Sequence, residues 1–195
     1  MDYTIKIIAI VGSLRKDSFN RQLAMEAEKT LDGLAEFELL DYSDVPLLNQ
    51  DIEYPAPDAV SRVRGIVKSA DGIWVFSPEY NHYFPGCLKN LIDWLSRPVS
   101  KSEPQVLSGK PAAVSGITSG ISGTLIAQDH LVTLLSFLNM KVMNQPRLTI
   151  PSAMQQTDKE GRLALTDSLP FLEKQAQSFV QFIINSKYGG KYEFL

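Results

Sequence analysis

Cysteine is nearly absent from this chain of 195 residues, in which Cys87 is the only one. A lone cysteine excludes an intrachain disulfide and a metal cluster held by several thiolates. No apolar run is long enough to cross a bilayer. The first residues also lack the basic, apolar and cleavage-site succession of a signal peptide. We therefore expect a cytoplasmic protein that does not associate with a membrane.

Clusters of basic residues are lacking as well. The formal net charge is -3 and lysine and arginine form no block, so nucleic acid is not expected as a partner. Hydrophobic residues make up 44% of the chain, which is enough for an ordinary folded core. The length predicts one domain over residues 1–195, with the polar segment 186–195 as a mobile tail.

Apolar β-branched runs alternate along the chain with segments whose apolar residues recur at helical spacing. The strand-like runs cover residues 5–11, 37–42, 72–76 and 110–116, with a last, interrupted one at 140–142 and 147–150. The helical periodicity covers residues 23–31, 59–70, 88–95, 124–139 and 170–185. This alternation predicts an α/β fold, a three-layer sandwich around a five-stranded parallel sheet.

A strand order of 2-1-3-4-5 would bring the loops after strands one, three and four to one edge of the sheet. Flavodoxin-like proteins have this order and hold FMN at the switch point between strands one and three. The sequence of these three loops therefore decides what kind of ligand is expected.

The first loop, Ser13–Arg21, is polar and leads into a helix. It lacks the three glycines of a dinucleotide fold and the Gly-Lys-Ser/Thr of a P-loop. Hydroxyls and helix N–H groups suit a terminal phosphate, and Arg15 and Arg21 could add charge-assisted hydrogen bonds. The alternative is that Ser18 only caps the helix and that both arginines are solvated.

The second loop, Ser77–Gly86, contains two prolines, two tyrosines, a histidine and a carboxylate between a buried strand and a helix. It has too many polar and aromatic groups for a simple connector. We interpret it as the segment that holds the flat part of a cofactor. The third loop, Thr118–Thr124, is rich in glycine and hydroxyls, so its backbone can approach a ligand closely.

Three segments carry a specific resemblance: Gly12–Asn20, Pro78–Asn81 and Pro85–Trp94. They resemble the NADPH-dependent FMN reductase family, the flavodoxin-like group that includes chromate, quinone and azo-dye reductases. The resemblance covers residues 5–150. The family usually has a Gly-Gly pair near the end of the third loop, where this chain has Ser122-Gly123.

The resemblance implies FMN as cofactor and assigns residues to it in three groups. The FMN phosphate would be surrounded by Ser13, Arg15, Ser18, Asn20 and Arg21. The isoalloxazine would lie along Pro78, Glu79, Tyr80 and Asn81. Its opposite edge would be lined by Ser115, Ser119, Gly120 and Gly123.

The resemblance also implies the reaction. NADPH or NADH would donate a hydride through FMN to a quinone or a similar small acceptor, such as an azo dye, chromate or free flavin, in a ping-pong cycle. Because the cofactor carries this chemistry, no catalytic side chain and no metal are expected. The family further implies a homodimer or homotetramer with the helix after Pro85 at a subunit contact.

Two other functions remain open at this stage. One is a flavodoxin-type FMN electron carrier without NAD(P)H activity of its own, and the other is a non-enzymatic oligomeric module. Individual residues also allow two interpretations. His82 either contacts substrate or is an ordinary surface residue, and Cys87 is a buried structural thiol or one activated at a helix start. Tyr83 and Phe84 form either a subunit contact or a lid.

Overall fold

The computed structural model describes residues 4–188. Its centre is a parallel sheet with the strand order β2-β1-β3-β4-β5 and a sixth strand, β6, that also pairs with β4. The strands are β1 (Lys6–Val11), β2 (Glu36–Leu39), β3 (Gly72–Phe76), β4 (Pro111–Ile117), β5 (Lys141–Val142) and β6 (Leu148–Ile150). The order predicted for five strands is thus confirmed, with one strand more than expected.

The additional strand arises because the interrupted strand predicted over residues 140–142 and 147–150 forms two separate strands, β5 and β6. Both of its parts lie along β4, where Ala112 pairs with Val142 and Ser115 pairs with Leu148. The second strand is shorter than predicted and ends at Leu39, although the Leu40 N–H still donates to the carbonyl of Ala9 (2.9 Å).

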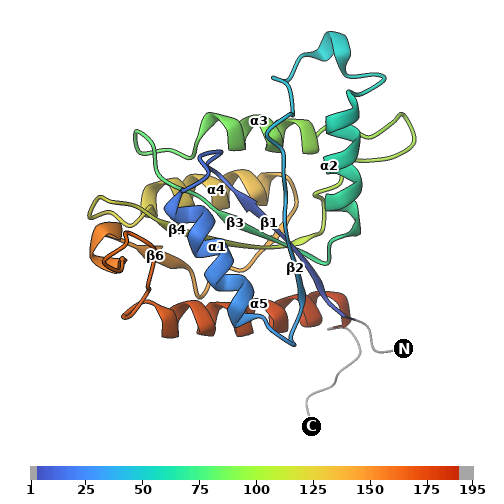
Figure 1. Ribbon diagram of the computed structural model, residues 1–195. Helices are drawn as coiled ribbons and strands as arrows, with labels where there is room; N and C mark the ends of the chain where they lie inside the picture. The colour runs from blue at the N-terminus through green and yellow to red at the C-terminus, as the bar shows by residue number, and fades with distance from the viewer. Residues whose placement is uncertain (1–3, 189–195) are drawn as a thin grey trace.

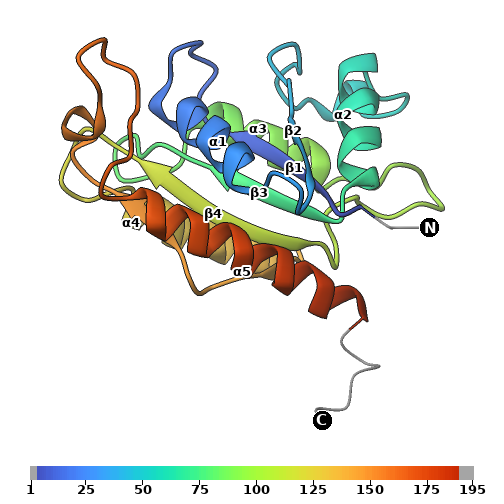
Figure 2. The same cartoon turned by 60° about the horizontal axis from the view of Figure 1, so that its bottom comes forward.

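Helices cover both faces of the sheet, as Figures 1 and 2 show. The helices are α1 (Phe19–Thr30), α2 (Asp58–Ser69), α3 (Gly86–Leu95), α4 (Leu125–Phe137) and α5 (Leu169–Tyr188), with the short 3-10 turns η1 (Gln50–Ile52) and η2 (Ala153–Gln156). Helices α1 and α5 pack on one face, and α2, α3 and α4 pack on the other. No helix in the part of the chain described here is long and apolar enough to cross a membrane.

The two faces follow from the alternation of side chains along β1. Ile7 and Ala9 belong to the core beneath α1 and α5, whereas Ile8 and Ile10 belong to the core beneath α2, α3 and α4. All four side chains are almost completely buried. A strand buried on both faces must be apolar throughout, which explains the continuous β-branched run in the sequence.

The predicted tail is partly replaced by helix. Residues 186–188 continue α5, because the helix runs to Tyr188, beyond the helix predicted to end at residue 185. The remaining tail residues, 189–195, lie outside the described residues.

Sheet register places the three ligand loops together. Val11 pairs with Phe76, and Phe76 pairs with Ser115, so β1, β3 and β4 reach the same edge of the sheet at nearly the same level. Just beyond that level, Gly116 lies where a Cβ atom would collide with the hydroxyl of Thr124 and the carbonyl of Ser77. Glycine here lets the second and third loops approach each other.

Gly116→Ala should therefore destabilise the protein by about 1–3 kcal/mol, the usual range for overpacking in a close-packed interior. Gly86→Ala is the control, because nothing lies within 4 Å of a Cβ at that position and its effect should stay within about 0.5 kcal/mol. Urea unfolding measures both variants. Equal stabilities of the two would show that Gly116 does not limit the approach of the loops.

Candidate cofactor site

A cavity of about 190 Å³ opens at the carboxyl ends of β1, β3 and β4. All three predicted loops contribute to it. Eight of the thirteen predicted cofactor-binding residues line it: Ser13, Arg15, Ser18, Asn20, Pro78, Glu79, Tyr80 and Ser119. This volume is smaller than pockets that enclose a drug-sized ligand, so the cavity suits one part of a nucleotide.

The first loop offers uncommitted donors to an anion. Ser18 is the N-cap of α1 and is only 4% exposed, but its side chain makes no capping hydrogen bond. The first N–H groups of a helix have no partner within the helix and form its positive end. The guanidinium of Arg15 is exposed beside them and makes no hydrogen bond or ion pair within residues 4–188. The simple capping role considered for Ser18 is thus not the one its hydroxyl plays.

Asn20 lines the same cavity but uses its side chain for another purpose. Its Nδ2 donates to the carbonyl of Ile117 (2.8 Å), and its Oδ1 accepts from the N–H of Ile117 (3.1 Å). The residue is 2% exposed. This two-bond clamp joins the first loop to the end of β4, so Asn20 positions the loop and these two atoms are not available to a cofactor.

Five of the thirteen predicted cofactor residues do not line the cavity, and two of these are Ser115 and Arg21. The hydroxyl of Ser115 is fully buried, accepts a hydrogen bond from Nε1 of Trp74 (2.8 Å) and donates to Oε1 of Gln175 (2.6 Å). Its alternation along β4 points it into the α1/α5 core, so its hydroxyl is already engaged there and is not available to a cofactor. Arg21 is exposed and lies outside the cavity that Arg15 lines.

The second loop ends in a tight hairpin. Tyr80 and Tyr83 exchange two backbone hydrogen bonds (2.8 and 3.0 Å), and both residues between them have positive φ, Asn81 at 53° and His82 at 58°. These angles characterise a two-residue type I′ turn, in which asparagine is favoured at the first position. Asn81 therefore lies at the tip of the hairpin and, unlike Tyr80, does not line the cavity.

The third loop contributes one of its predicted cofactor residues to the cavity lining. Ser119 lines the cavity, but Gly120 and Gly123 do not. Gly123 has a φ of 61° and packs against the backbone of Thr149 and Pro151. Glycine is favoured at this position by the positive φ and by the close backbone of Thr149 and Pro151.

The carboxylate of Glu79 links the second loop to the third. One oxygen accepts from the N–H of Ala127 (3.0 Å) and the other from the hydroxyl of Ser122 (3.3 Å), while Nδ1 of His82 lies 3.4 Å away. The Glu79 side chain is only 6% exposed. Because Thr124, the N-cap of α4, makes no side-chain cap, Glu79 supplies that cap from a distant segment. It is a polar anchor of the loops.

The aromatic residues near the second loop divide into core and surface. Phe84 is 3% exposed and belongs to the core, so it is not available as a lid or subunit contact. Tyr83 stacks on Phe84 (4.3 Å between centroids), packs against His130 (4.5 Å) and remains 43% exposed. Cys87 is half-buried, with Sγ 3.3 Å from the carbonyl of Gly12, which agrees with a structural thiol.

Sequence reasoning missed three residues that line the cavity: Phe19, Ile117 and Thr118. Thr118 opens the hydroxyl-rich third loop and could have been included on that ground. Phe19 and Ile117 are apolar residues at the ends of a helix and a strand, and such residues give no functional signal in a sequence. Among residues 4–188, no three His, Cys, Asp or Glu side chains gather as they would around a metal ion.

Residues 5–155 match the family model described as NADPH-dependent FMN reductase. The chain belongs to this family. It is 39% identical over 179 residues to an NAD(P)H-dependent FMN reductase of Pseudomonas aeruginosa, covering 91% of this chain and 95% of that one. It is 35% identical to a 2-hydroxy-1,4-benzoquinone reductase of a Burkholderia species, covering 92% and 96%. Family membership confirms the predicted enzyme class, an NAD(P)H-dependent FMN or quinone reductase.

Solved structures agree with this assignment. The flavoenzyme NAD(P)H:(acceptor) oxidoreductase FerB from Paracoccus denitrificans has a TM-score of 0.84 and 33% identity, covering 94% of this chain and 99% of that one. An FMN-dependent NADH-azoreductase from Bacillus anthracis, solved with FMN, has a TM-score of 0.64 at 13% identity, covering 91% and 100%. The latter shares only the fold.

The residues of the cavity suit the cofactor of this FMN-dependent family. The unpaired N–H groups of α1, the free hydroxyl of Ser18 and the guanidinium of Arg15 match a phosphate monoester, which accepts several hydrogen bonds. A Cβ at Gly12 would lie 3.1 Å from Cδ of Pro78, so glycine lets the first and second loops meet. The first and second loops thus adjoin each other.

Glu79→Gln should loosen the start of α4. Glutamine has a single acceptor oxygen and cannot replace both carboxylate contacts, and hydrogen bonds to charged groups contribute about 1.5–3 kcal/mol. We expect a fall of about 1–2 kcal/mol in the free energy of unfolding, together with faster hydrogen exchange at Ala127. Glu173→Gln, on the exposed side of α5, is the control and should change neither. Unaltered exchange at Ala127 would mean that Glu79 does not cap α4.

Proposed function

We propose that the chain reduces a small acceptor, a quinone in the first instance, with NAD(P)H as donor and FMN held at the cavity. The observation that carries the proposal is the meeting of three loops around donors that have no partner of their own. The names of the relatives support it, since several proteins 33–35% identical over more than nine-tenths of this chain are quinone reductases.

The roles of the side chains follow from their free atoms. Ser13, Arg15 and Ser18, with the N–H groups at the start of α1, would hold the phosphate. Pro78 and Tyr80 would lie beside the ring, with Glu79 behind them as the anchor to α4. When bound, FMN supplies the two-electron chemistry between a nicotinamide and an acceptor. The protein binds and orients, and no acid–base pair is needed.

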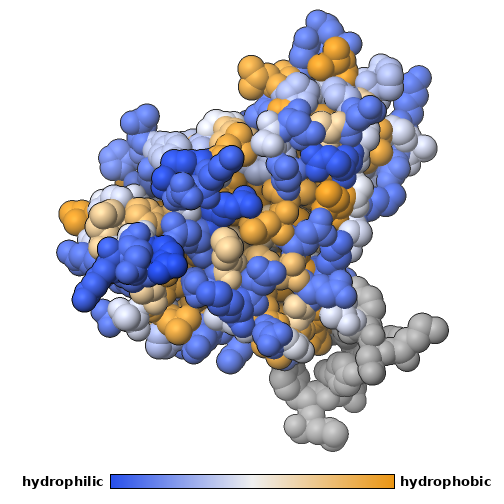
Figure 3. Space-filling model, in the orientation of Figure 1, coloured by the Kyte–Doolittle hydropathy of each residue, from blue (hydrophilic) through white to orange (hydrophobic). Residues whose placement is uncertain are grey.

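The surface offers a basis for the predicted homodimer or homotetramer, which we retain as a proposal. Blue and orange residues are interspersed on the face shown in Figure 3. Large apolar side chains are nevertheless exposed on α4 and just before it, with Phe137 at 84%, Ile121 at 92% and Leu125 at 48%. On α3, by contrast, the apolar side chains are mainly buried. We therefore propose α4 as the larger part of the subunit contact. Light scattering of Phe137→Asp would test this by measuring the molar mass of the particle in solution.

A cytoplasmic location also stays a prediction.

A ping-pong cycle is expected, because the donor and the acceptor would each reach the same flavin in turn. Initial rates measured against NADPH at several fixed quinone concentrations should give parallel double-reciprocal lines. The protein as purified should be yellow, and adding a quinone should speed the aerobic consumption of NADPH.

Lines that intersect would contradict the ping-pong order while leaving the reductase activity in place. Yellow protein that does not oxidise NADPH would instead favour the electron carrier. Colourless protein that cannot take up FMN would favour a non-enzymatic module.

A further inference from the structure

Among the residues predicted to surround the FMN phosphate, Arg21 is the one that does not line the cofactor cavity. All seven arginines of the chain lie within residues 4–188. Five of them donate hydrogen bonds: Arg62, Arg64, Arg97, Arg147 and Arg162. In this part of the chain, Arg15 and Arg21 alone among the arginines make no side-chain hydrogen bond or ion pair. Arg15 lines the cofactor cavity, so Arg21 is left as a cation without an assigned anion.

Arg21 lines a second and larger hollow beside the cofactor cavity. This hollow, of about 550 Å³, lies between the first loop and the carboxyl end of β2, and we call it the β2 hollow. Ser13 lines both it and the cofactor cavity, so the two adjoin. Its volume falls in the range of pockets that take a drug-sized ligand.

The lining of the β2 hollow combines charge with apolar surface. Lys16 and Arg21 supply two positive charges, and Lys16 has no ion pair among the residues that the structure describes. Leu14, which is 52% exposed, and Leu39 supply apolar surface. Asp41 is its single acid. A ligand with a flat apolar part and an anionic group would match this lining.

The carboxylate of Asp41 has a fixed position. Its Oδ1 accepts hydrogen bonds from the N–H (3.0 Å) and the hydroxyl (2.8 Å) of Ser43. These bonds, with smaller contributions from the charges of Arg62 and Arg21, lower the pKa of Asp41, so it is ionised at neutral pH. In other α/β folds that bind nicotinamide nucleotides, an acid beyond the first βα unit contacts the adenosine ribose, and a nearby arginine accommodates a 2′-phosphate.

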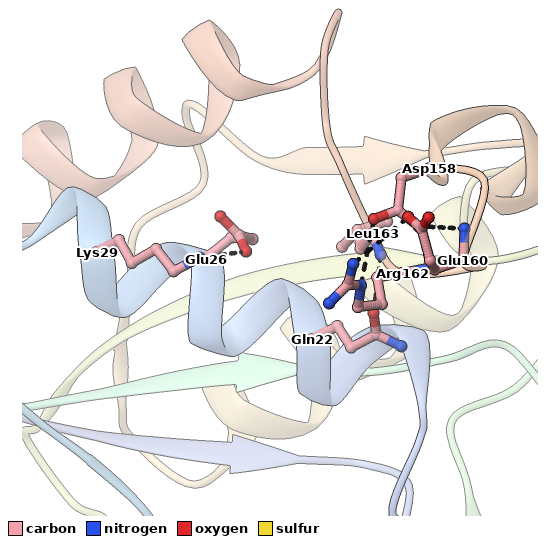
Figure 4. A network of polar contacts seen from close by, with 7 residues as sticks. All are labelled: Gln22, Glu26, Lys29, Asp158, Glu160, Arg162 and Leu163. Carbon is pink, nitrogen blue, oxygen red and sulfur yellow. Dashed lines mark hydrogen bonds and ion pairs between the residues drawn. The ribbon is translucent and has the colours of Figure 1, made fainter.

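A third hollow, also lined by Lys16 and Arg21, is a weaker candidate. It lies between α1 and the segment around Arg162, and Figure 4 shows its polar network. Arg162 is bound to Asp158 and Glu160, and Lys29 is bound to Glu26. Four acidic side chains balance its four basic ones, whereas the β2 hollow has two basic side chains and one acid. Of these two hollows, only the β2 hollow has more basic than acidic side chains in its lining.

We propose that the β2 hollow binds the adenosine end of NADPH, with Arg21 and Lys16 holding the 2′-phosphate. The inference rests on the proposed function, since it assigns a place to the donor of that reaction. It places the adenosine beside the loop that holds the FMN phosphate, on the far side of Ser13. Asp41 then opposes the 2′-phosphate and limits how strongly NADPH is preferred over NADH.

The test uses the protein as purified and two probes, adenosine 2′,5′-bisphosphate and adenosine 5′-monophosphate, with binding measured by calorimetry. We expect the bisphosphate to bind at least about tenfold tighter, because charge-assisted hydrogen bonds to a phosphate are strong. Arg21→Ala and Lys16→Ala should each weaken bisphosphate binding by about tenfold and leave the monophosphate unchanged. Lys174→Ala removes the same charge from the exposed side of α5 and should change the binding of neither probe.

Asp41→Asn should change bisphosphate binding in the opposite direction to Arg21→Ala and Lys16→Ala. Asparagine keeps the Oδ1 acceptor for Ser43 but removes the charge, so bisphosphate binding should become tighter. Two results would overturn the proposal: equal binding of both probes by the wild type, or Arg21→Ala that binds the bisphosphate like Lys174→Ala. Circular dichroism of each variant shows that it is folded.

Steady-state kinetics give a second, separate measurement. Arg21→Ala should raise the KM for NADPH by about tenfold with kcat and the KM for NADH unchanged. An equal rise for both nucleotides would overturn the assignment of the 2′-phosphate. If the wild type oxidises neither nucleotide, the proposed function fails, but the calorimetry still decides whether the β2 hollow binds an adenosine phosphate.

Discussion

The hydrogen bonds between Asn20 and Ile117 are the interaction on which the site depends. They are buried, they use both polar atoms of the amide, and they join segments 97 residues apart. Glu79 makes the equivalent connection from the second loop to α4. Since a buried polar group without a partner is costly, each of these side chains has one strongly preferred place. Three loops that are far apart in sequence are held as one surface.

This arrangement explains why the free donors gather in the first loop. Asn20 and Glu79 are occupied with the backbone of neighbouring elements, so they stabilise the cavity. Arg15, Ser18 and the start of α1 are left to a ligand. Side chains that already have hydrogen-bond partners build the site, and those without partners can bind a ligand. This distinction separates neighbouring residues of the first loop. Asn20 and Arg21 are adjacent in sequence, yet one is buried in a clamp and the other is exposed.

Much of the fold could be predicted because the signals were local. The β-branched run of residues 5–11 and the helical spacing of residues 88–95 each determine an element, and their alternation predicts a parallel sheet. The strand order came from the likeness to flavodoxin-like proteins. Side-chain direction at the end of a strand could not be predicted. Ser115 resembles a ligand residue in sequence, but it points into the core because β4 is buried on both faces. The cap that Glu79 provides for α4 spans 48 residues and also leaves no local signal.

The central claim is that the first loop binds the phosphate of FMN. Affinities of the FMN-free protein for FMN and for riboflavin, which lacks only the phosphate, test it most directly. Wild-type protein should bind FMN at least about a hundredfold tighter than riboflavin, and Arg15→Ala should lose about 1.5–3 kcal/mol of FMN binding with riboflavin binding unchanged. Equal affinity of the wild type for the two flavins would contradict the account.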